Sequence, residues 1–122
     1  MIMMVGRRNT SFMDTQTNVV EIVQPSGILD GTNGNELRNQ VLAAIAAGGT
    51  IILIDCQSVT FMDSNGFGAL ITCLKKVREA GGRLALCAIN DQVRLILELT
   101  GTHQVFEVFS DREAFYQSLV QH

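Results

Sequence analysis

The segment from Val59 to Gly68 places a carboxylate and a hydroxyl side by side, at Asp63 and Ser64. It joins an apolar run at residues 51–54 to a segment whose apolar residues recur at helical spacing. We therefore expect Asp63 and Ser64 where a strand is followed by the beginning of a helix. Backbone N–H groups at such a beginning are unpaired and carry a partial positive charge, which favours anions. Ser64 could cap this helix, or it could carry a phosphate that the helix end would tolerate.

Other kinds of chemistry find little support. Gly66 and Gly68 suggest a dinucleotide-binding loop, but Ile71 stands where the third glycine of that fingerprint belongs. A Ser-His-Asp triad needs a histidine, and the two candidates are His103, in an expected turn, and His122, the last residue. The sequence contains neither a phosphate-binding loop of the GxxxxGKS type nor an HExxH motif. We therefore expect no enzymatic active site and no cofactor.

The cysteines do not suggest a metal centre. Cys56, Cys73 and Cys87 lie in apolar patterns, and none of them forms a CxxC pair. Their spacing does not match known zinc sites. We expect all three to be buried and to act as small hydrophobic residues.

Length and composition indicate one compact domain. The chain has 122 residues, 47% of them hydrophobic and 17% charged. Its net charge is −3, with acidic and basic residues interspersed, which does not favour nucleic-acid binding. Arg7 and Arg8 are followed by polar residues at 14–18 instead of an export signal's apolar segment, and no run approaches the ~20 apolar residues of a membrane span. We expect a cytoplasmic protein that does not insert into membranes.

Segments rich in branched and apolar residues predict strands. They are residues 18–23, 50–56, 83–89 and 105–109, with 11–13 as a further edge strand. Helical patterns separate them, so the interior of the sheet should be parallel, with the N-terminal strands antiparallel at one edge. The predicted fold class is α/β, with a mixed sheet of about four to five strands flanked by about four helices. Residues 1–10 are predicted to be a flexible tail, and residues 11–122 a single domain.

Capping patterns predict where the helices begin. Asn33 and Ser110 each precede a glutamate by three residues, as in a capping box, and Asn90 or Asp91 is expected to cap the helix between them. Residues 28–30 are expected to lead into a loop before the first helix.

Four segments, taken together and in order, resemble motifs of the STAS domain family, and in particular of its anti-sigma factor antagonists. They are Ser26–Asp30, Val59–Leu70, Gly81–Cys87 and Leu99–Gly101. Of these, Val59–Leu70 is similar to the family's switch motif, in which an aspartate and a serine precede a glycine. The likeness extends from about residue 19 to residue 119, which is nearly the whole chain.

The resemblance implies a partner switch. In this family the dephosphorylated antagonist binds an ATP-bound anti-sigma factor, which is also a serine kinase, and so frees the sigma factor. The kinase phosphorylates the serine after the motif's aspartate, and a PP2C-type phosphatase reverses this. By position, the resemblance implies Ser64 as the phosphorylation site, Asp63 as the kinase-facing aspartate and Asp30 as part of the partner-binding loop. The implied partner-binding residues are Asp30, Met62, Asp63, Ser64, Asn65 and Gly66.

Each of these residues also has a purely structural interpretation. Ser64 could be an ordinary N-cap, and Asp63 could only satisfy loop amides. Asp30 could serve simple turn chemistry, and Gly66 could be needed for close approach of neighbouring backbone. Met62 is expected to anchor the loop by packing and to be open to a partner.

Asn65 departs from the family pattern, which usually has Ser or Thr after the phosphorylated serine. This motivates a second hypothesis, a STAS scaffold that is not phosphorylated and serves as a subunit of a transporter or signalling complex. A third hypothesis is a domain that binds a small ligand or nucleotide at the same helix beginning. The sequence leaves the oligomeric state open.

Overall fold

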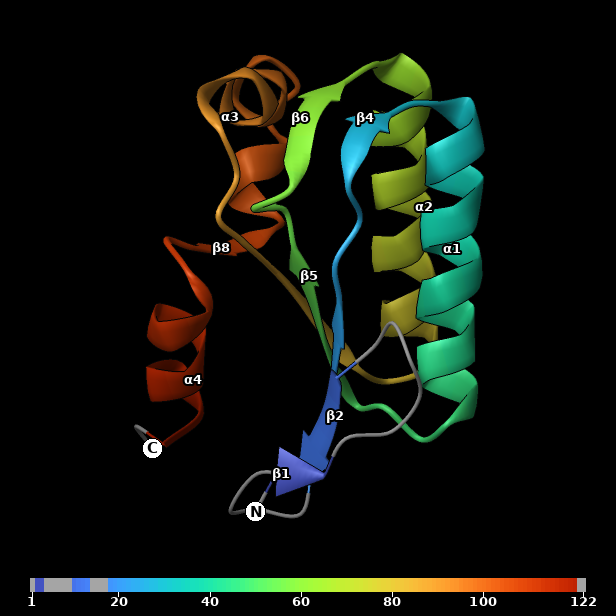
Figure 1. Cartoon of the computed structure of the whole chain (residues 1–122), viewed down its shortest axis with the longest axis vertical. Helices are drawn as coiled ribbons and strands as arrows, with labels where there is room; N and C mark the ends of the chain where they lie inside the picture. The colour runs from blue at the N-terminus through green and yellow to red at the C-terminus, as the bar shows by residue number, and fades with distance from the viewer. Residues whose placement is uncertain (1, 4–9, 14–17, 121–122) are drawn as a thin grey trace.

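A six-stranded sheet forms the centre of the molecule. The computed structural model describes residues 2–3, 10–13 and 18–120. The strand order is β1-β2-β3-β5-β7-β8 (Figure 1). Strands β3, β5, β7 and β8 are parallel, while β1 and β2 pair antiparallel at one edge. The bounds are β1 Ile2–Met3, β2 Thr10–Met13, β3 Val19–Val23, β5 Ile51–Asp55, β7 Arg83–Cys87 and β8 Glu107–Phe109.

Helices pack on both faces of this sheet. Helices α1, α2 and α3 contribute to one hydrophobic cluster, and α4 contributes to a second cluster on the opposite face. In the described part of the chain the α-helices are α1 Gly31–Ala46, α2 Ser64–Glu79, α3 Asp91–Leu99 and α4 Arg112–Val120. A short 3₁₀ turn at Thr102–Gln104, which contains His103, follows α3.

Strand β5 is buried on both faces, which explains its nearly continuous apolar sequence. Ile52 and Ile54 pack in the cluster with α1 and α2, whereas Ile51 and Leu53 pack with Phe115 of α4. Alternate side chains of one strand therefore serve the two clusters.

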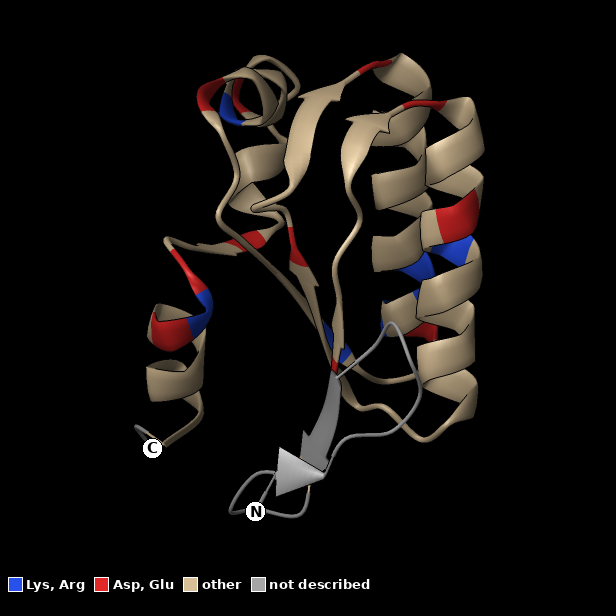
Figure 2. Ribbon diagram, in the orientation of Figure 1, with Lys and Arg blue, Asp and Glu red and all other residues tan. Residues whose placement is uncertain are grey.

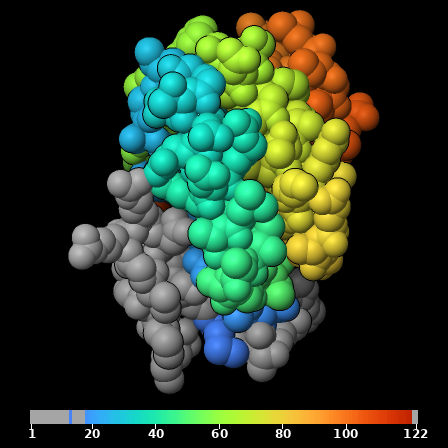
Figure 3. Space-filling view, turned by 90° about the vertical axis from the view of Figure 1, so that its right-hand side faces the viewer, coloured from blue at the N-terminus to red at the C-terminus, as the bar shows by residue number. Residues whose placement is uncertain are grey.

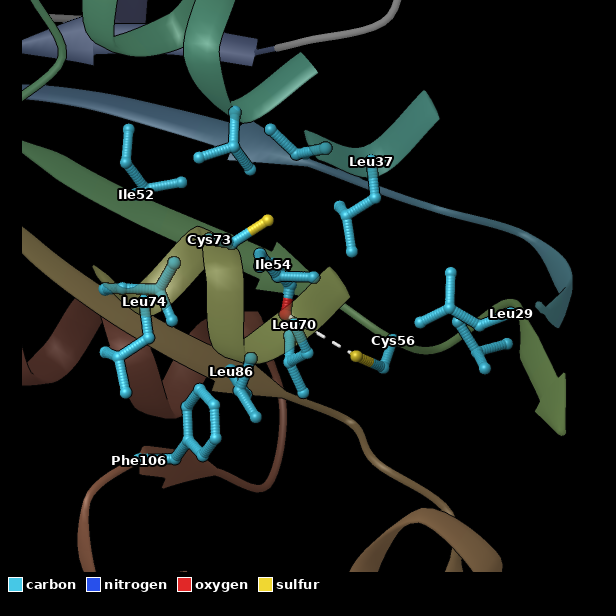
Figure 4. Packing of buried hydrophobic residues seen from close by; sticks show 14 of the residues in the cluster. Leu29, Leu37, Ile52, Ile54, Cys56, Leu70, Cys73, Leu74, Leu86 and Phe106 are labelled. Atoms are coloured by element: carbon cyan, nitrogen blue, oxygen red, sulfur yellow. Dashed lines mark hydrogen bonds between the residues drawn. The ribbon is translucent and has the colours of Figure 1, made fainter. Parts of the chain in front are cut away.

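A second, two-stranded sheet lies at the end of the molecule where α1 and α2 begin (Figure 1). Its strands, β4 Gly27–Leu29 and β6 Val59–Met62, are parallel, and they follow β3 and β5 along the chain. Leu29 is 1% exposed and belongs to the same cluster as Leu37 and Leu70 (Figure 4). The small sheet is thus held to the helix layer by apolar packing.

The predicted α/β class is confirmed, but some details of it were wrong. The main sheet has six strands instead of four to five. Residues 28–30 were expected to lead into a loop, and the structure instead has β4 up to Leu29 and α1 from Gly31. The segment between β5 and α2 was likewise expected to be a loop and contains β6. Both strands are short, and a bulge disturbs their pairing, so neither shows the alternation that identifies a strand in sequence.

Two predicted N-caps are also corrected. The first helix begins at Gly31, and Asn33 donates its backbone N–H to the Asp30 carboxylate instead of acting as the cap itself. Asp111, rather than Ser110, accepts the N–H of Ala114 at the start of α4. The predicted cap Asn90 is confirmed, since its side chain accepts the N–H of Val93.

The burial of the cysteines is confirmed: Cys56, Cys73 and Cys87 are buried and not in disulfides. Burial raises the pKa of each thiol to about 12, so these side chains stay protonated and unreactive at neutral pH. Within residues 2–3, 10–13 and 18–120, no helix is long and apolar enough to cross a membrane. Most of the predicted tail, residues 1–10, lies outside the described residues, and its flexibility stays a prediction.

An ion pair joins α4 to the end of β5. Asp55 is 1% exposed, and its carboxylate accepts a hydrogen bond from Arg112 Nε at 2.5 Å and one from the backbone N–H of Gln57 at 3.0 Å. Arg112 Nη2 also donates to the side chain of Gln24 at 2.9 Å. Removing Arg112 would leave a buried carboxylate without its counter-charge, which is strongly destabilising.

Candidate functional site

Two similar strand–aspartate–helix units lie next to each other at one end of the molecule. In the first, β4 is followed by Asp30 and α1, and in the second, β6 is followed by Asp63 and α2. Both aspartates have extended backbone and cap their helix: Asp30 Oδ1 accepts from Asn33 N at 3.0 Å, and Asp63 Oδ1 accepts from Gly66 N at 2.9 Å. Figure 2 shows an acidic position, coloured red, at the beginning of each of the neighbouring helices α1 and α2.

Two glycines allow the units to approach this closely. A Cβ on Gly66 would lie 1.9 Å from the carbonyl oxygen of Leu29, a distance that no structure could accept. A Cβ on Gly34 would lie 2.8 Å from the Cβ of Ala69, so α1 and α2 are in direct contact near their first turns. The N–H of Asp63 also donates to the Leu29 carbonyl at 3.1 Å, which ties the start of α2 to the end of β4.

Ser64 is the first residue of α2, and its side chain is exposed. Its hydroxyl has no hydrogen-bond partner among the described residues. The backbone N–H groups of Ser64 and Asn65 also have no partner among the described residues. The next two N–H groups of the helix are paired, that of Gly66 with the Asp63 carboxylate and that of Phe67 with the Asp63 carbonyl. A hydroxyl therefore stands in solvent beside unpaired N–H donors at the positive end of a helix dipole.

The charge around this end is acidic. Residues 25–37 contain Asp30 and Glu36, residues 57–74 contain Asp63, and neither stretch contains Lys or Arg. Lys76 and Arg78 lie in the last turn of α2, at the opposite end of the helix. Figure 3 shows the first turns of α1 and α2 side by side on the surface, so this acidic end is accessible.

The structure brings most of the predicted site residues together and corrects the expected exposure of one of them. The adjoining beginnings of α1 and α2 hold Asp30, Asp63, Ser64 and Asn65. The two helix beginnings are close, since a Cβ placed on Gly31 would lie 3.8 Å from the Cβ of Asn65. Met62 is only 1% exposed, so the expectation that it would be open to a partner is wrong. Its side chain packs inward with Leu29 in the main cluster.

The structural interpretations of Gly66, Ser64 and Asp63 have different outcomes. Gly66 is buried against the Leu29 backbone, which confirms that this glycine permits close approach within the domain. Ser64 is not the N-cap, because Asp63 occupies that position. The alternative in which Asp63 satisfies backbone amides is confirmed for one of its oxygens.

Two residues that the motif did not reveal hold β6 in place. Gln92 of α3 accepts from Met62 N and donates to Met62 O, both at 2.8 Å. Asn90, besides capping α3, donates to the carbonyls of Val59 and Thr60 at 3.2 Å. These contacts span about thirty residues of sequence, and side-chain bonds of that separation leave no local pattern.

The described residues offer no cluster of three or more His, Cys, Asp or Glu side chains that could hold a metal ion. His103 is remote from Ser64 in the chain, and its ring faces the Leu97 carbonyl at 3.4 Å. The features that stand out at this end are thus the exposed hydroxyl, the two capping carboxylates and the unpaired helix amides.

The STAS domain family matches residues 11–115, which is most of the chain. The chain belongs to this family. Among curated relatives, the anti-sigma F factor antagonist of Paenibacillus polymyxa is 29% identical over 93 residues, covering 75% of this chain and 80% of the relative. The anti-sigma-B factor antagonist of Bacillus subtilis is 26% identical over 106 residues, covering 86% of this chain and 96% of the relative.

Solved structures of STAS proteins share the fold. The Bacillus cell fate determinant SpoIIAA in its phosphorylated form superimposes with a TM-score of 0.64 at 22% identity, covering 90% of this chain and 98% of that one. A sulfate transporter family protein from Wolinella succinogenes superimposes with a TM-score of 0.72 at 21% identity, covering 89% and 97%. At these identities the likeness demonstrates the fold and not the activity.

Proposed function

We propose that this protein is an anti-sigma factor antagonist that acts as a phosphorylation-controlled binding module in the cytoplasm. In its unphosphorylated form it binds an anti-sigma factor that is also an ATP-bound serine kinase. Phosphorylation of Ser64 by this kinase ends the complex, and a PP2C-type phosphatase restores it. The names of the curated relatives support the general role. The observation that carries the switch is the exposed, unbonded hydroxyl of Ser64 at the first position of α2.

The domain itself should accept a phosphate on Ser64 without refolding. The added group brings about −1.5 to −2 charge and three acceptor oxygens. The amides of Ser64 and Asn65 have no other partner in the described structure, and the helix dipole favours an anion there. Since Ser64 is exposed and belongs to neither hydrophobic cluster, no core contact has to change.

A bound partner would meet a different situation. Asp30 and Asp63 already make this end negative, and residues 25–37 and 57–74 contain no Lys or Arg to offset them. Helix α3, which contacts β6, carries Arg94 together with Asp91 and Glu98 and so adds no net positive charge. A partner that fits the unmodified end would have to accommodate a bulky dianion at the centre of the contact. Leaving such a charge unpaired in an interface costs several kcal/mol, or on the order of a hundredfold in affinity.

Asn65 does not alter this geometry. It is exposed at the second position of α2, and the Asp63 cap is formed without it. Its effect is therefore confined to the surface that a kinase meets next to Ser64. We propose that it adjusts partner preference and leaves Ser64 the acceptor.

The direct test is phosphorylation by the anti-sigma kinase encoded near this gene, followed by mass mapping of the phosphate. We expect phosphate on Ser64, and none on Thr32, which is also exposed in the first turn of the neighbouring helix α1. Ser64→Asp should weaken binding of the ATP-bound kinase about a hundredfold, whereas Ser64→Ala should bind like the wild type. Absence of phosphate on Ser64, together with unchanged binding of Ser64→Asp, would contradict the proposal.

A second candidate function is a STAS subunit of a transporter complex. Two observations favour it: the structural likeness to the sulfate transporter family protein from Wolinella succinogenes, and Asn65 in place of the usual Ser or Thr. Affinity capture from the native organism separates the candidates. Recovery of a transporter together with a lack of phosphate on Ser64 would favour this second function.

A further inference from the structure

Two large apolar side chains lie exposed on the small sheet, on the strands that lead to the capping aspartates. Ile28 of β4 is 53% exposed, and Phe61 of β6 is 48% exposed. They are direct partners in the parallel register of the two strands, which places them side by side at the ~4.8 Å spacing of neighbouring strands. Residues on either side of the pair, Leu29 and Met62, point into the core and are each 1% exposed.

A bulge in β6 is what turns Phe61 outward. In a regular strand, Val59 and Met62 would face opposite sides, yet they are 4% and 1% exposed and both belong to the core. The register passes from Gly27–Val59 directly to Ile28–Phe61, so Thr60 is the extra residue. The bulge thus allows Met62 to pack inward while Phe61 faces solvent next to Ile28.

The bulge is fixed by hydrogen bonds from α3. Asn90 donates to the carbonyls of Val59 and Thr60, and Gln92 bonds both backbone groups of Met62. Bulges are features that redirect a side chain, and they are frequent near functional sites. Here the redirected side chain is an exposed phenyl ring, two residues before Asp63 and three before Ser64.

We propose that Ile28 and Phe61 form the apolar part of the surface that binds the anti-sigma kinase, and that the matching surface of the kinase is an apolar depression bordered by Lys or Arg. This inference rests on the proposed function. The apolar pair is continuous along β4 and β6 with Asp30 and Asp63, so one partner can cover both. The carboxylates supply the complementary charge for a basic border.

The acidic surroundings disfavour other occupants. A second copy of this chain, docked on the same patch, would bring Asp30 and Asp63 of both copies close together, and such like-charge contacts are costly. An anionic membrane surface would be repelled for the same reason. An apolar surface with basic residues around it is the partner that satisfies both the exposed pair and the carboxylates.

The test measures the affinity of the purified, ATP-bound kinase from the same genome for a set of full-length variants. Phe61→Ala should weaken binding about thirtyfold, as expected for an aromatic residue at the centre of an interface. Ile28→Ala should weaken it about fivefold. The matched control is Leu42→Ala, because Leu42 is 45% exposed but lies twelve residues along α1 from Asp30, roughly 18 Å away.

Salt dependence tests the charged border. Binding of the wild type should weaken as sodium chloride rises from about 0.05 M to about 0.5 M, because screening reduces attraction between opposite charges. Circular dichroism of every variant verifies that the fold is retained, and Ile28→Ala gives a second reading of the patch if Phe61→Ala does not fold.

The outcomes separate this inference from the function on which it rests. If Phe61→Ala and Ile28→Ala bind the kinase as tightly as Leu42→Ala while Ser64→Asp binds it weakly, Ile28 and Phe61 are not part of the binding surface. The proposed function then stands and this inference is overturned. Binding that grows stronger with salt overturns the basic border. If the wild type binds no kinase and Ser64 takes no phosphate, both proposals fall together.

Discussion

The two strand–aspartate–helix units are built alike, yet only one of them presents a hydroxyl as the first residue of its helix. Each has a short strand, an aspartate in extended conformation that caps the helix, and a helix of 16 residues. In the β4–α1 unit the first helical residue is Gly31, and in the β6–α2 unit it is Ser64. The architecture therefore supplies two equivalent helix beginnings, and residue type decides which one can carry the proposed phosphate.

The units also differ in how their strands are held. Strand β6 receives four side-chain hydrogen bonds from Asn90 and Gln92. On β4, the corresponding support is one side-chain bond from Asn33 to the carbonyl of Ile28, at an exposed position. The segment that carries Ser64 is thus more tightly fixed than its neighbour, and such pre-organisation would favour the binding that we propose for it.

Glycine replacements should give the largest difference between the two units in the free energy of unfolding. Gly66→Ala should lower the free energy of unfolding by about 3 kcal/mol, because the new Cβ would overlap the Leu29 carbonyl. Gly34→Ala in α1 should cost about 1–2 kcal/mol, since the one tight contact of its Cβ, at 2.8 Å, is with the Ala69 side chain. As the matched control, Gly68→Ala has open space and should gain about 0.5–1 kcal/mol. Urea unfolding measures all three, and equal effects at Gly66 and Gly68 would refute the close approach.

Removal of the side-chain hydrogen bonds that hold β6 and β4 should give the next largest difference in the free energy of unfolding. Gln92→Ala should cost about 2 kcal/mol, because it removes the partners of both Met62 backbone groups in a part-buried place. Asn33→Ala should cost about 0.5–1 kcal/mol, since water can replace its exposed bond. The same unfolding assay applies. A cost at Asn33 equal to that at Gln92 would show that the two strands are held alike.

The two caps should prove nearly equivalent in stability. Asp63→Ala and Asp30→Ala should each cost about 1 kcal/mol, and the Asn variants should restore most of it, because Asn caps as well as Asp. If the carboxylate charge serves the partner, Asp63→Asn should nevertheless weaken kinase binding. Thermal unfolding and the binding assay, run on the same samples, separate capping from recognition.

The smallest expected effect is that of phosphate on stability. Phosphorylated Ser64 should change the free energy of unfolding by less than about 1 kcal/mol, since the helix dipole gain is of that size and the group touches no core residue. Phosphorylated and unphosphorylated samples compared by urea unfolding provide the measurement. A change of several kcal/mol would place the switch in the fold instead of at the interface.

Local sequence patterns predicted the large sheet and the helices well. Strands β3, β5, β7 and β8 have apolar runs that are long enough to recognise, and β2 was expected at the edge. The small sheet escaped prediction because β4 has three residues and β6 contains a bulge at Thr60. Where a strand is that short, pairing across about thirty residues determines its structure more than its own sequence does.

Helix beginnings were harder to predict, and for a consistent reason. Asn33, Ser64 and Ser110 each satisfied a capping pattern, but in every case a neighbouring aspartate took the position. Continuation of β4 and β6 to Leu29 and Met62 leaves the next residue extended, which is the backbone that a cap needs. The motif placed Asp30, Asp63, Ser64 and Asn65 correctly at one end, whereas the burial of Met62 depended on the bulge, which no local pattern revealed.

The side-chain amides of Asn90 and Gln92, which bond the backbone of β6, affect whether copies of this protein can aggregate through that strand. A two-stranded sheet normally offers bare backbone groups to which a foreign strand can add, the first step in runaway polymerisation. Asn90 and Gln92 occupy those groups on β6. The exposed phenyl ring next to them can therefore be recognised by its side chain alone, without turning the molecule into a template for fibres.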